Sequence, residues 1–490
     1  MVLTPFGKKV IKSGAWVFIT NILKQSFFLI RLIVLARLLA PGDFGLFGIA
    51  LVTLAALDTF SQIGFREALI QKKEDTDSFL DTAWTVGVVR GFLLAGILFA
   101  MAPSISFFFK TPQAKSVLQA ICLAIVFRGF INITALYFEK KLEFHKYSFY
   151  QMAGAIADVV VSVSAAIILR SVWALVFGRI ARELVLCVAS YVIDPYRPRF
   201  RFDLEKAKSL FGFGKWVMAS SALIFLLNQG DDIFVGKLLG VAALGFYQMA
   251  YHISNMPATQ ITHVISQVTF PAYAKVQDNI ERLRGAYLMT LRATAFLAFP
   301  IAGLMFILAG DFTRIFLSEK WMPMVPAMQV LCVYGAIRSI NATVGPILHG
   351  VGKPEIQTRL SAVQLIVMVV LIYPLSVRWG IVGTSFAVVI PAVLALVMIV
   401  REIKHIIAGA YKDFAVRIFP PAIAVLVMLF VALAQRRMFA PINSIGGFIV
   451  TLVFLGSVYL AVVYAGYGKS RRAIMMRTRN IIGSFLNRKK

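Results

Sequence analysis

The sequence predicts an all-α, polytopic membrane protein with fourteen transmembrane helices: two pseudo-twofold-related six-helix bundles followed by two C-terminal helices. Three observations support this prediction, namely the composition, the length of the apolar runs and an internal repeat. Of the 490 residues, 59% are hydrophobic and only 15% are charged, which is more apolar than the core of a soluble protein requires. The apolar runs are continuous over about twenty residues, enough to cross a ~30 Å hydrocarbon core, and they do not alternate as the strands of a membrane barrel would.

The predicted helices follow one another along the whole chain. The opening "MVLTPFGKKVIKSGAW" has no short apolar region that ends in a small-residue cleavage site, so the first long apolar run is expected to remain as a membrane span. Each later run is again long enough to cross the bilayer. The predicted ranges are 14–35, 44–64, 80–102, 116–137, 148–169, 172–193, 216–236, 243–266, 289–309, 325–348, 360–378, 380–400, 415–434 and 445–466.

The positive charge of the chain lies mostly on one side of the predicted membrane. The formal net charge is +27. With a cytoplasmic N-terminus, the cytoplasmic segments carry roughly three times as many Lys and Arg as the outer segments, as the positive-inside rule requires. This distribution explains the basic balance without a nucleic-acid partner and places both termini in the cytoplasm. Further cations fall within the spans or at their ends: Lys24, Arg31, Arg90, Arg128, Arg179, Arg182, Lys215, Arg292 and Arg338.

A repeat at an offset of 200 residues predicts the two bundles. The segment "ARLLAPGDFGLFGIA" at 36–50 returns as "GKLLGVAALGFYQMA" at 236–250. Six helices per copy is an even number, so both copies enter the membrane from the same side and an axis along the membrane normal relates them. Chance similarity between apolar helices is the alternative. Matched pairs include Trp16 with Trp216, Arg37 with Lys237, Gly45 with Gly245 and, where the offset drifts, Arg128 with Arg338.

The repeat also predicts the domain boundaries. The first bundle takes residues 1–195, a polar cytoplasmic linker takes 196–212, and the second bundle takes 213–405. Two extra helices and a basic cytoplasmic tail take 406–490. In transporters with parallel repeats the substrate site lies between the bundles, so polar residues on helices facing that space are the functional candidates.

Two stretches carry a resemblance to a known family. "RLIVLARLLAPGDFGLFGIA" at 31–50 and "FSQIGFREALIQKKE" at 60–74, with the repeat and the two extra helices, resemble the polysaccharide transporter branch of the multidrug/oligosaccharidyl-lipid/polysaccharide exporter superfamily, most of all its Wzx and colanic-acid-exporter flippases. The resemblance implies a secondary transporter of the bacterial inner membrane that flips undecaprenyl-diphosphate-linked oligosaccharide for lipopolysaccharide or exopolysaccharide biosynthesis, without ATP hydrolysis. It also implies membrane lipids, a polysaccharide polymerase and glycosyltransferases as partners.

Polar residues within the spans are the candidate site. A charged side chain at mid-membrane costs roughly 2.5–3.5 kcal/mol on insertion scales, so each one requires a partner or a pathway. Asn21, Lys24, Gln25 and Arg31 follow a spacing of three and four residues, which puts one polar stripe along the first helix. Asn255 belongs to a similar stripe on the eighth helix. We interpret these stripes as walls of a hydrated cavity.

Arginines on other helices complete the predicted substrate site. Arg90, Arg128 and Arg338 provide guanidinium groups that can bind the oxygens of a diphosphate in pairs. The alternative for Arg128 and Arg338 is a structural role, with their charge neutralised by Asp158 or Glu183. For Arg179 and Arg182, the alternative to a role in transport is a buried ion pair with Glu183.

An acidic pair lies on the second copy of the stripe. Asp231 and Asp232 are predicted to couple transport to an ion or to act as a gate, with Asp231 facing Arg31, its repeat equivalent, across the pseudo-twofold axis. The predicted site therefore comprises Asn21, Lys24, Gln25, Arg31, Arg90, Arg128, Asn255 and Arg338 for substrate and Asp231 and Asp232 for the ion or gate.

Other functions have weaker signals. A multidrug or other lipid exporter of the same superfamily is the alternative, although cationic drugs favour an acidic, aromatic cavity. A membrane glycosyltransferase, polymerase or ligase needs catalytic groups on a large outer loop, and the longest predicted outer loop has only about fifteen residues. Cys122, Cys187 and Cys332 lie in apolar runs as an odd set, which argues against disulfides and thiolate metal sites. We therefore expect neither enzymatic activity nor a metal or other cofactor.

Overall fold

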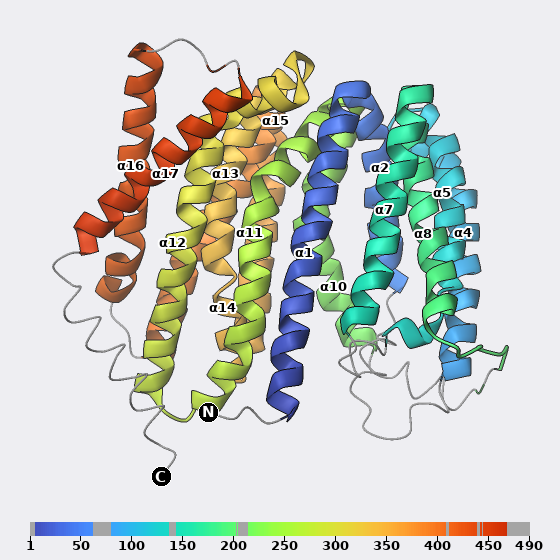
Figure 1. Ribbon diagram of the computed structural model, residues 1–490, viewed down its shortest axis with the longest axis horizontal. Helices are drawn as coiled ribbons and strands as arrows, with labels where there is room; N and C mark the ends of the chain where they lie inside the picture. Colours follow the sequence, from blue (N-terminus) through green and yellow to red (C-terminus); the bar gives the residue numbers. More distant parts are fainter. Residues whose placement is uncertain are drawn as a thin grey trace. The chain divides into compact units, whose positions relative to one another are not determined.

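Helices make up all the regular structure in the part of the chain that the structure describes (Figure 1). The computed structural model describes residues 5–61, 80–136, 144–201, 203, 214–407, 411–438, 442 and 444–467. Every predicted span overlaps one of its helices. These are α1 (Pro5–Leu38), α2 (Pro41–Ser61), α4 (Leu80–Phe108), α5 (Gln113–Gly129), α7 (Phe144–Leu169), α8 (Trp173–Ile193), α10 (Gly214–Leu238), α11 (Val241–Val276), α12 (Ile280–Phe312), α13 (Val325–Asn341), α14 (Val344–Gly350), α15 (Pro354–Ile406), α16 (Tyr411–Met438) and α17 (Ile445–Tyr467).

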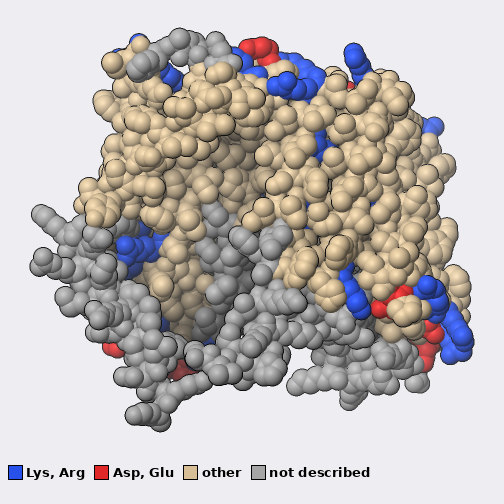
Figure 2. All heavy atoms as spheres, viewed as in Figure 1, with Lys and Arg blue, Asp and Glu red and all other residues tan. Residues whose placement is uncertain are grey.

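The helices are those of a multi-pass membrane protein. Among the described residues, 8 helical segments are long and apolar enough to cross a membrane. Helices α1, α5, α8, α10 and α11 are not among them. Figure 2 shows a broad surface without charged side chains on the viewed face, with Lys and Arg gathered mainly at the upper edge and the lower right of the view. The total of fourteen crossings stays a prediction.

Two predicted spans are shorter or broken in the structure, and the end of a third is not described. Helix α5 ends at Gly129 rather than 137, because backbone N–H groups that would continue the helix have other acceptors. That of Asn132 donates to the Ser190 hydroxyl at 2.9 Å, and that of Thr134 donates to the Asn132 side chain at 3.1 Å. The predicted span 325–348 is broken between α13 and α14. Residues 62–64, the predicted end of the second span, lie outside the described residues.

Helix α15 contains a reversal of the chain, as the two predicted ranges 360–378 and 380–400 require. Gly380 has φ 57° and ψ −138°, a conformation that only glycine adopts without strain. The hydroxyls of Ser376 and Thr384 lie 2.7 Å apart, although eight residues of continuous helix would separate them by about 12 Å. The chain therefore folds back at Gly380 into two antiparallel helices.

The described chain divides into two compact units. Unit 1 comprises residues 1–249 and 316–323, and unit 2 comprises residues 250–315 and 324–490. Unit 1 thus contains α10 and the first turns of α11, which the repeat assigns to the second bundle, because α10 packs on α2. The fully buried side chains of unit 1 are mostly aliphatic and include Leu35, Leu39, Ile49, Leu98, Leu118 and Ile121.

The acidic residue of the "APGDFG" motif, Asp43, stabilises the turn between α1 and α2. Its carboxylate accepts hydrogen bonds at 2.9 Å from two backbone N–H groups, those of Ala40 and Val172. The first bond closes the turn between α1 and α2, and the second ties this turn to the one between α7 and α8. A single carboxylate therefore joins two interhelical turns of unit 1.

The repeated glycines meet each other in unit 1, which accounts for their presence in both copies. A Cβ atom on Gly45 would lie 1.8 Å from the carbonyl oxygen of Val241, and one on Gly245 would lie 1.9 Å from that of Pro41. Pro41 and Val241 are themselves repeat equivalents. Such a reciprocal contact is the pattern that a twofold relation between two turns produces.

The basic residues of the repeat show the same reciprocity. Arg37 donates to the carbonyl oxygen of Phe316 at 2.8 Å, and its equivalent Lys237 donates to that of Phe108. Phe108 ends α4 and Phe316 follows α12, which are corresponding helices of the two copies. The substitution of Arg by Lys therefore retains one function, which is to bind a carbonyl group at the end of a helix from the other copy.

Unit 2 is built around α12, which packs against α13, α16 and α17. Ion pairs join α12 to both ends of α16: Arg284 pairs with Asp413, and Arg436 with Asp311. The Tyr459 hydroxyl of α17 donates to the carbonyl oxygen of Phe296 at 3.0 Å. The two C-terminal helices are thereby attached to α12 by polar contacts as well as by apolar packing.

Candidate functional site

Unit 1 contains a cavity of about 470 Å³, with charged side chains in a mainly apolar lining, between α2, α4, α5, α7 and α8. Its apolar lining comes from residues such as Leu54, Leu94 and Ile125, which supply the mostly apolar wall usual in a binding pocket. Its charged lining consists of four arginines and two carboxylates: Arg90, Arg128, Arg179, Arg182, Asp58 and Glu183. The predicted Arg90 and Arg128 are thus brought together in one cavity.

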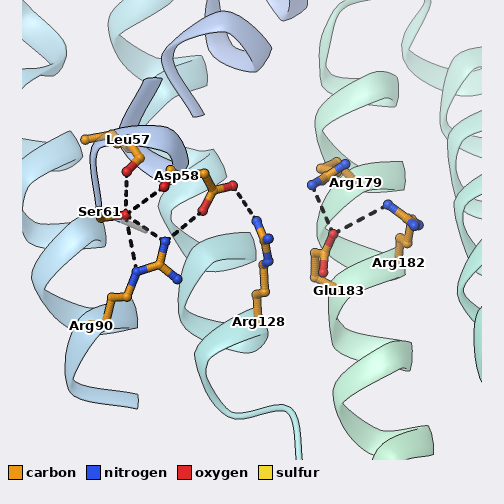
Figure 3. A network of polar contacts seen from close by, with 8 residues as sticks. All are labelled: Leu57, Asp58, Ser61, Arg90, Arg128, Arg179, Arg182 and Glu183. Atoms are coloured by element: carbon orange, nitrogen blue, oxygen red, sulfur yellow. Dashed lines mark hydrogen bonds and ion pairs between the residues drawn. The ribbon is translucent and has the colours of Figure 1, made fainter. Parts of the chain in front are cut away.

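Asp58 of α2 binds the two arginines that the sequence predicted (Figure 3). One carboxylate oxygen lies 3.3 Å from Arg90 of α4, and the other accepts from Arg128 of α5. Arg90 also donates to the Ser61 hydroxyl, through Nε at 3.2 Å and through a terminal nitrogen at 2.6 Å. The expected neutralising partners of Arg128 were Asp158 and Glu183. In the structure Arg128 forms its ion pair with Asp58 instead.

Glu183 forms a second group of the same composition on α8. Its carboxylate lies 3.1 Å from Arg179 and 3.7 Å from Arg182, as the sequence alternative for these residues stated (Figure 3). Only 5% of the Glu183 side chain is exposed. The Nε atom of Arg179 is buried without a hydrogen-bond partner in the described part of the chain.

The charges that line the cavity do not balance. Four guanidinium groups face two carboxylates, which leaves an excess of two positive charges. Each guanidinium carries five N–H donors, so roughly twenty donors compete for four carboxylate oxygens. Charge-assisted hydrogen bonds to guanidinium groups suit phosphate oxygens as well as carboxylates, and they strengthen where water is scarce. The cavity is therefore able to bind a polyanion.

The polar stripe of α1 faces α7. Lys24 donates to Gln151 at 3.4 Å, and Gln151 lines the cavity. Arg31 lies 3.2 Å from Asp158 and donates to the Ser162 hydroxyl at 3.0 Å. Lys24 thus reaches the edge of the cavity, whereas Arg31 has an interhelical ion pair deeper along α7. The predicted Asn21 and Gln25 also lie on α1, and both are partly buried.

Two predicted residues belong to unit 2 and meet at Tyr251. Arg338 donates to the Tyr251 hydroxyl at 3.4 Å, and the Asn255 side chain donates to the Tyr251 carbonyl oxygen at 3.2 Å. Asn255 is only 2% exposed, and its side-chain oxygen has no hydrogen-bond partner among the described residues. Arg338 and Asn255 thus form a small polar group of unit 2.

The acidic pair lies at the contact between α10 and the start of α11. Tyr247 donates to Asp231 at 2.6 Å, and Gln248 donates to Asp232 at 3.1 Å. The expected partner of Asp231 across the pseudo-twofold axis was Arg31. In this conformation Arg31 pairs with Asp158 instead, because its side chain points toward α7.

Sequence reasoning missed one of the two carboxylates of the cavity, Asp58. It treated cations within spans as the functional signal and left Asp58 unassigned, although Asp58 lies in a predicted span and is equally costly to bury alone. Ser61, three residues later on the same face of α2, follows the same spacing argument. Gln151 gave no distinguishing signal, because an isolated amide at the start of an apolar run is common at a helix end.

Comparisons with known proteins agree with this architecture. The family described as polysaccharide biosynthesis protein matches residues 34–326. The lipopolysaccharide biosynthesis protein WzxC of Escherichia coli (strain K12) is 25% identical over 418 residues, which cover 84% of this chain and 85% of WzxC. The teichuronic acid biosynthesis protein TuaB of Bacillus subtilis (strain 168) is 25% identical over 304 residues, 61% of this chain and 63% of TuaB.

Solved structures share the fold. A lipid II flippase, MurJ, in an inward closed conformation superposes with a TM-score of 0.77 at 14% identity, covering 94% of this chain and 99% of MurJ. An inward-facing multidrug resistance transporter of the MATE family superposes with a TM-score of 0.58 at 15% identity, over 79% of this chain and 96% of its own. Since the family match spans more than half of the sequence, the chain belongs to the polysaccharide biosynthesis protein family, in the polysaccharide transporter branch of the multidrug/oligosaccharidyl-lipid/polysaccharide exporter superfamily.

Proposed function

We propose that this protein flips undecaprenyl-diphosphate-linked oligosaccharide across the bacterial inner membrane for surface polysaccharide biosynthesis, by alternating access and without chemical change of the substrate. The observation that carries the proposal is the arginine-rich cavity of unit 1, with its excess of two positive charges. A diphosphate is the only strongly anionic group that every such lipid shares. Relatives named for lipopolysaccharide and teichuronic acid biosynthesis support the same substrate class.

The proposed membrane arrangement has fourteen spans, in six, six and two, with both termini cytoplasmic. With this arrangement α1 runs outward, α2 runs inward, and the last turns of α2 and α5 lie near the cytoplasm. Asp58 lies three residues before the end of α2, and Arg128 lies one residue before the end of α5. The cavity then opens in the cytoplasmic half of unit 1, on the side where glycosyltransferases assemble the substrate. A polymerase then acts on the product on the outer side.

The remaining predicted residues have places in this proposal. Lys24 supplies a further positive charge at the edge of the cavity. Arg338 and Asn255 form a separate polar group within unit 2, and we propose them as further substrate-binding residues. The acidic pair of α10 is the proposed ion-coupling site, since each carboxylate is held by a side-chain donor, Tyr247 or Gln248, rather than by a cation.

An exporter of cationic drugs is the alternative within the same fold. Four arginines in one cavity would repel an organic cation, because two carboxylates neutralise only part of their charge. The geometry therefore favours the anionic lipid.

Reconstitution into liposomes tests the proposal. A short-chain polyprenyl-diphosphate disaccharide with a fluorophore on the sugar becomes accessible to a membrane-impermeant quencher when it is flipped. We expect Arg90→Gln and Arg128→Gln each to lower the initial flipping rate at least about tenfold, since each removes charge-assisted hydrogen bonds worth about 1.5–3 kcal/mol.

The control changes an arginine of the same kind outside the cavity. Arg359 pairs with Glu402 in unit 2, and its side chain is 59% exposed. Arg359→Gln should flip the lipid within about twofold of the unsubstituted protein. Equal rates for all three variants would contradict the phosphate-binding cavity, and uptake of ethidium in place of the lipid would favour the drug exporter.

A further inference from the structure

We propose that Asp58 is a resident counter-anion: it occupies the phosphate-binding arginines in the empty cavity and is displaced when the diphosphate binds. This inference rests on the proposed function and adds a residue that competes with the substrate. Its basis is the position of Asp58, whose two oxygens bind arginines of two other helices. A phosphate oxygen can take the place of a carboxylate oxygen on the same guanidinium donors.

Glu183 provides the contrast that singles out Asp58. Glu183 and both of its arginines lie on α8, so this group moves with its helix as one piece. Its side chain is 5% exposed, whereas that of Asp58 is 29% exposed. Asp58 belongs to α2 and its arginines belong to α4 and α5. The Asp58 contacts therefore depend on how three helices are placed, and they are open to the cavity.

Ser61 allows the exchange to take place without loss of the site. Its hydroxyl oxygen accepts from two guanidinium nitrogens of Arg90, at 3.2 Å and 2.6 Å, and its hydroxyl hydrogen is bound by the Leu57 carbonyl oxygen of the same helix (Figure 3). When Asp58 leaves, this hydroxyl keeps the Arg90 side chain in place for the incoming phosphate. Arg128, with a side chain that is 49% exposed, has the greater access to the ligand.

Displacement of Asp58 also alters the attachment of α2. In the empty cavity Asp58 ties the end of α2 to α4 and α5. The other end of α2 carries Gly45, which contacts the start of α11 about 20 Å away along the helix axis. Substrate binding would therefore release the end of α2 from α5, while Ser61 keeps this end attached to Arg90 of α4. The other end of α2 lies at the contact between the two repeat copies.

Binding of inorganic pyrophosphate to the full-length protein in lipid nanodiscs tests the competition, with sulfate at matched ionic strength as the comparison anion. Asp58→Asn keeps the side-chain shape but removes the competing charge, and it should bind pyrophosphate about tenfold tighter than the unsubstituted protein. Glu183→Gln removes the same charge from a group that does not exchange, and it should tighten binding by less than about threefold. Asp58→Glu should restore the original affinity.

Spin labels at two exposed positions test the displacement itself. Phe60 on α2 and Leu123 on α5 are 51% and 53% exposed, and each is replaced by a labelled cysteine after the three native cysteines are changed to alanine. Pyrophosphate should change the distance between the labels in the otherwise unsubstituted protein. In Asp58→Asn the ligand-free distance should already equal that of the ligand-bound form.

The outcomes separate this inference from the proposed function. Tighter binding in Asp58→Asn, together with a label distance that no longer responds, supports the counter-anion. If Asp58→Asn and Glu183→Gln tighten pyrophosphate binding equally, only the net charge of the cavity matters. That result overturns the counter-anion role of Asp58 and leaves the diphosphate site supported. Pyrophosphate binding no stronger than sulfate in every variant overturns the diphosphate site itself.

Discussion

Replacing Gly45 with alanine should destabilise the protein, because this glycine lies at the reciprocal contact between the repeat turns. The added Cβ would be 1.8 Å from the Val241 carbonyl oxygen and 2.7 Å from its carbonyl carbon. Real Cβ atoms essentially never come closer than 3.0 Å, so the two turns must separate by about 1.2 Å. Overpacking of this kind costs about 1–3 kcal/mol, and both partners here are backbone segments that cannot rotate away.

The measurement is the midpoint of thermal unfolding in detergent, followed by intrinsic tryptophan fluorescence. Gly245→Ala should lower the midpoint by a similar amount, because its Cβ would be 1.9 Å from the Pro41 carbonyl oxygen. The double variant should lower the midpoint by less than the sum of the two single decreases, since the separation forced by one alanine makes room for the other.

Gly42 provides a matched control on the same turn. A Cβ added there meets nothing within 4 Å, so Gly42→Ala should be neutral or slightly stabilising. Midpoints for Gly45→Ala and Gly245→Ala that equal the midpoint for Gly42→Ala would refute the close contact. Additive losses in the double variant would refute the reciprocity while leaving the individual contacts intact.

Two further predictions concern the turn motif and the topology. Asp43→Ala should lower the free energy of unfolding by about 1–3 kcal/mol, because the backbone N–H groups of Ala40 and Val172 lose their acceptor. If the midpoint of thermal unfolding does not change in Asp43→Ala, water replaces the carboxylate and the prediction is wrong. Reporters fused after Lys490 or within 196–210 should be cytoplasmic, whereas one near residue 440 should be exported, and an exported C-terminal reporter would change the number of spans from even to odd.

The positions of the helices were predictable because the signal is local. An apolar run of about twenty residues both forms a helix and partitions into a bilayer, whatever its neighbours are. The reversal at Gly380 separates two such runs and was therefore anticipated, whereas the end of α5 at Gly129 was not. That end depends on Asn132, whose side chain and backbone bind Tyr196 and Ser190, residues some sixty positions away in the sequence.

The arginines of the cavity were predictable for a related reason. A guanidinium group in an apolar run requires compensation, so the sequence alone marks Arg90 and Arg128 as candidates. Their partner could not be predicted in this way, because the choice among Asp58, Asp158 and Glu183 depends on which helix faces meet. Packing of α2 on α5, which itself packs on α4, selects Asp58, and packing of α1 on α7 gives Asp158 to Arg31.

The sequence by itself determined the class of the protein, its helices, its internal repeat and the positive charge of its site. The tertiary structure decided which charges neutralise one another, which remain available in a cavity, and why the repeat retains its glycines. The physical reason is that membrane insertion and helix formation depend on the composition of one segment at a time. Ion pairs and close backbone contacts depend on the relative placement of several segments, and no single segment encodes that placement.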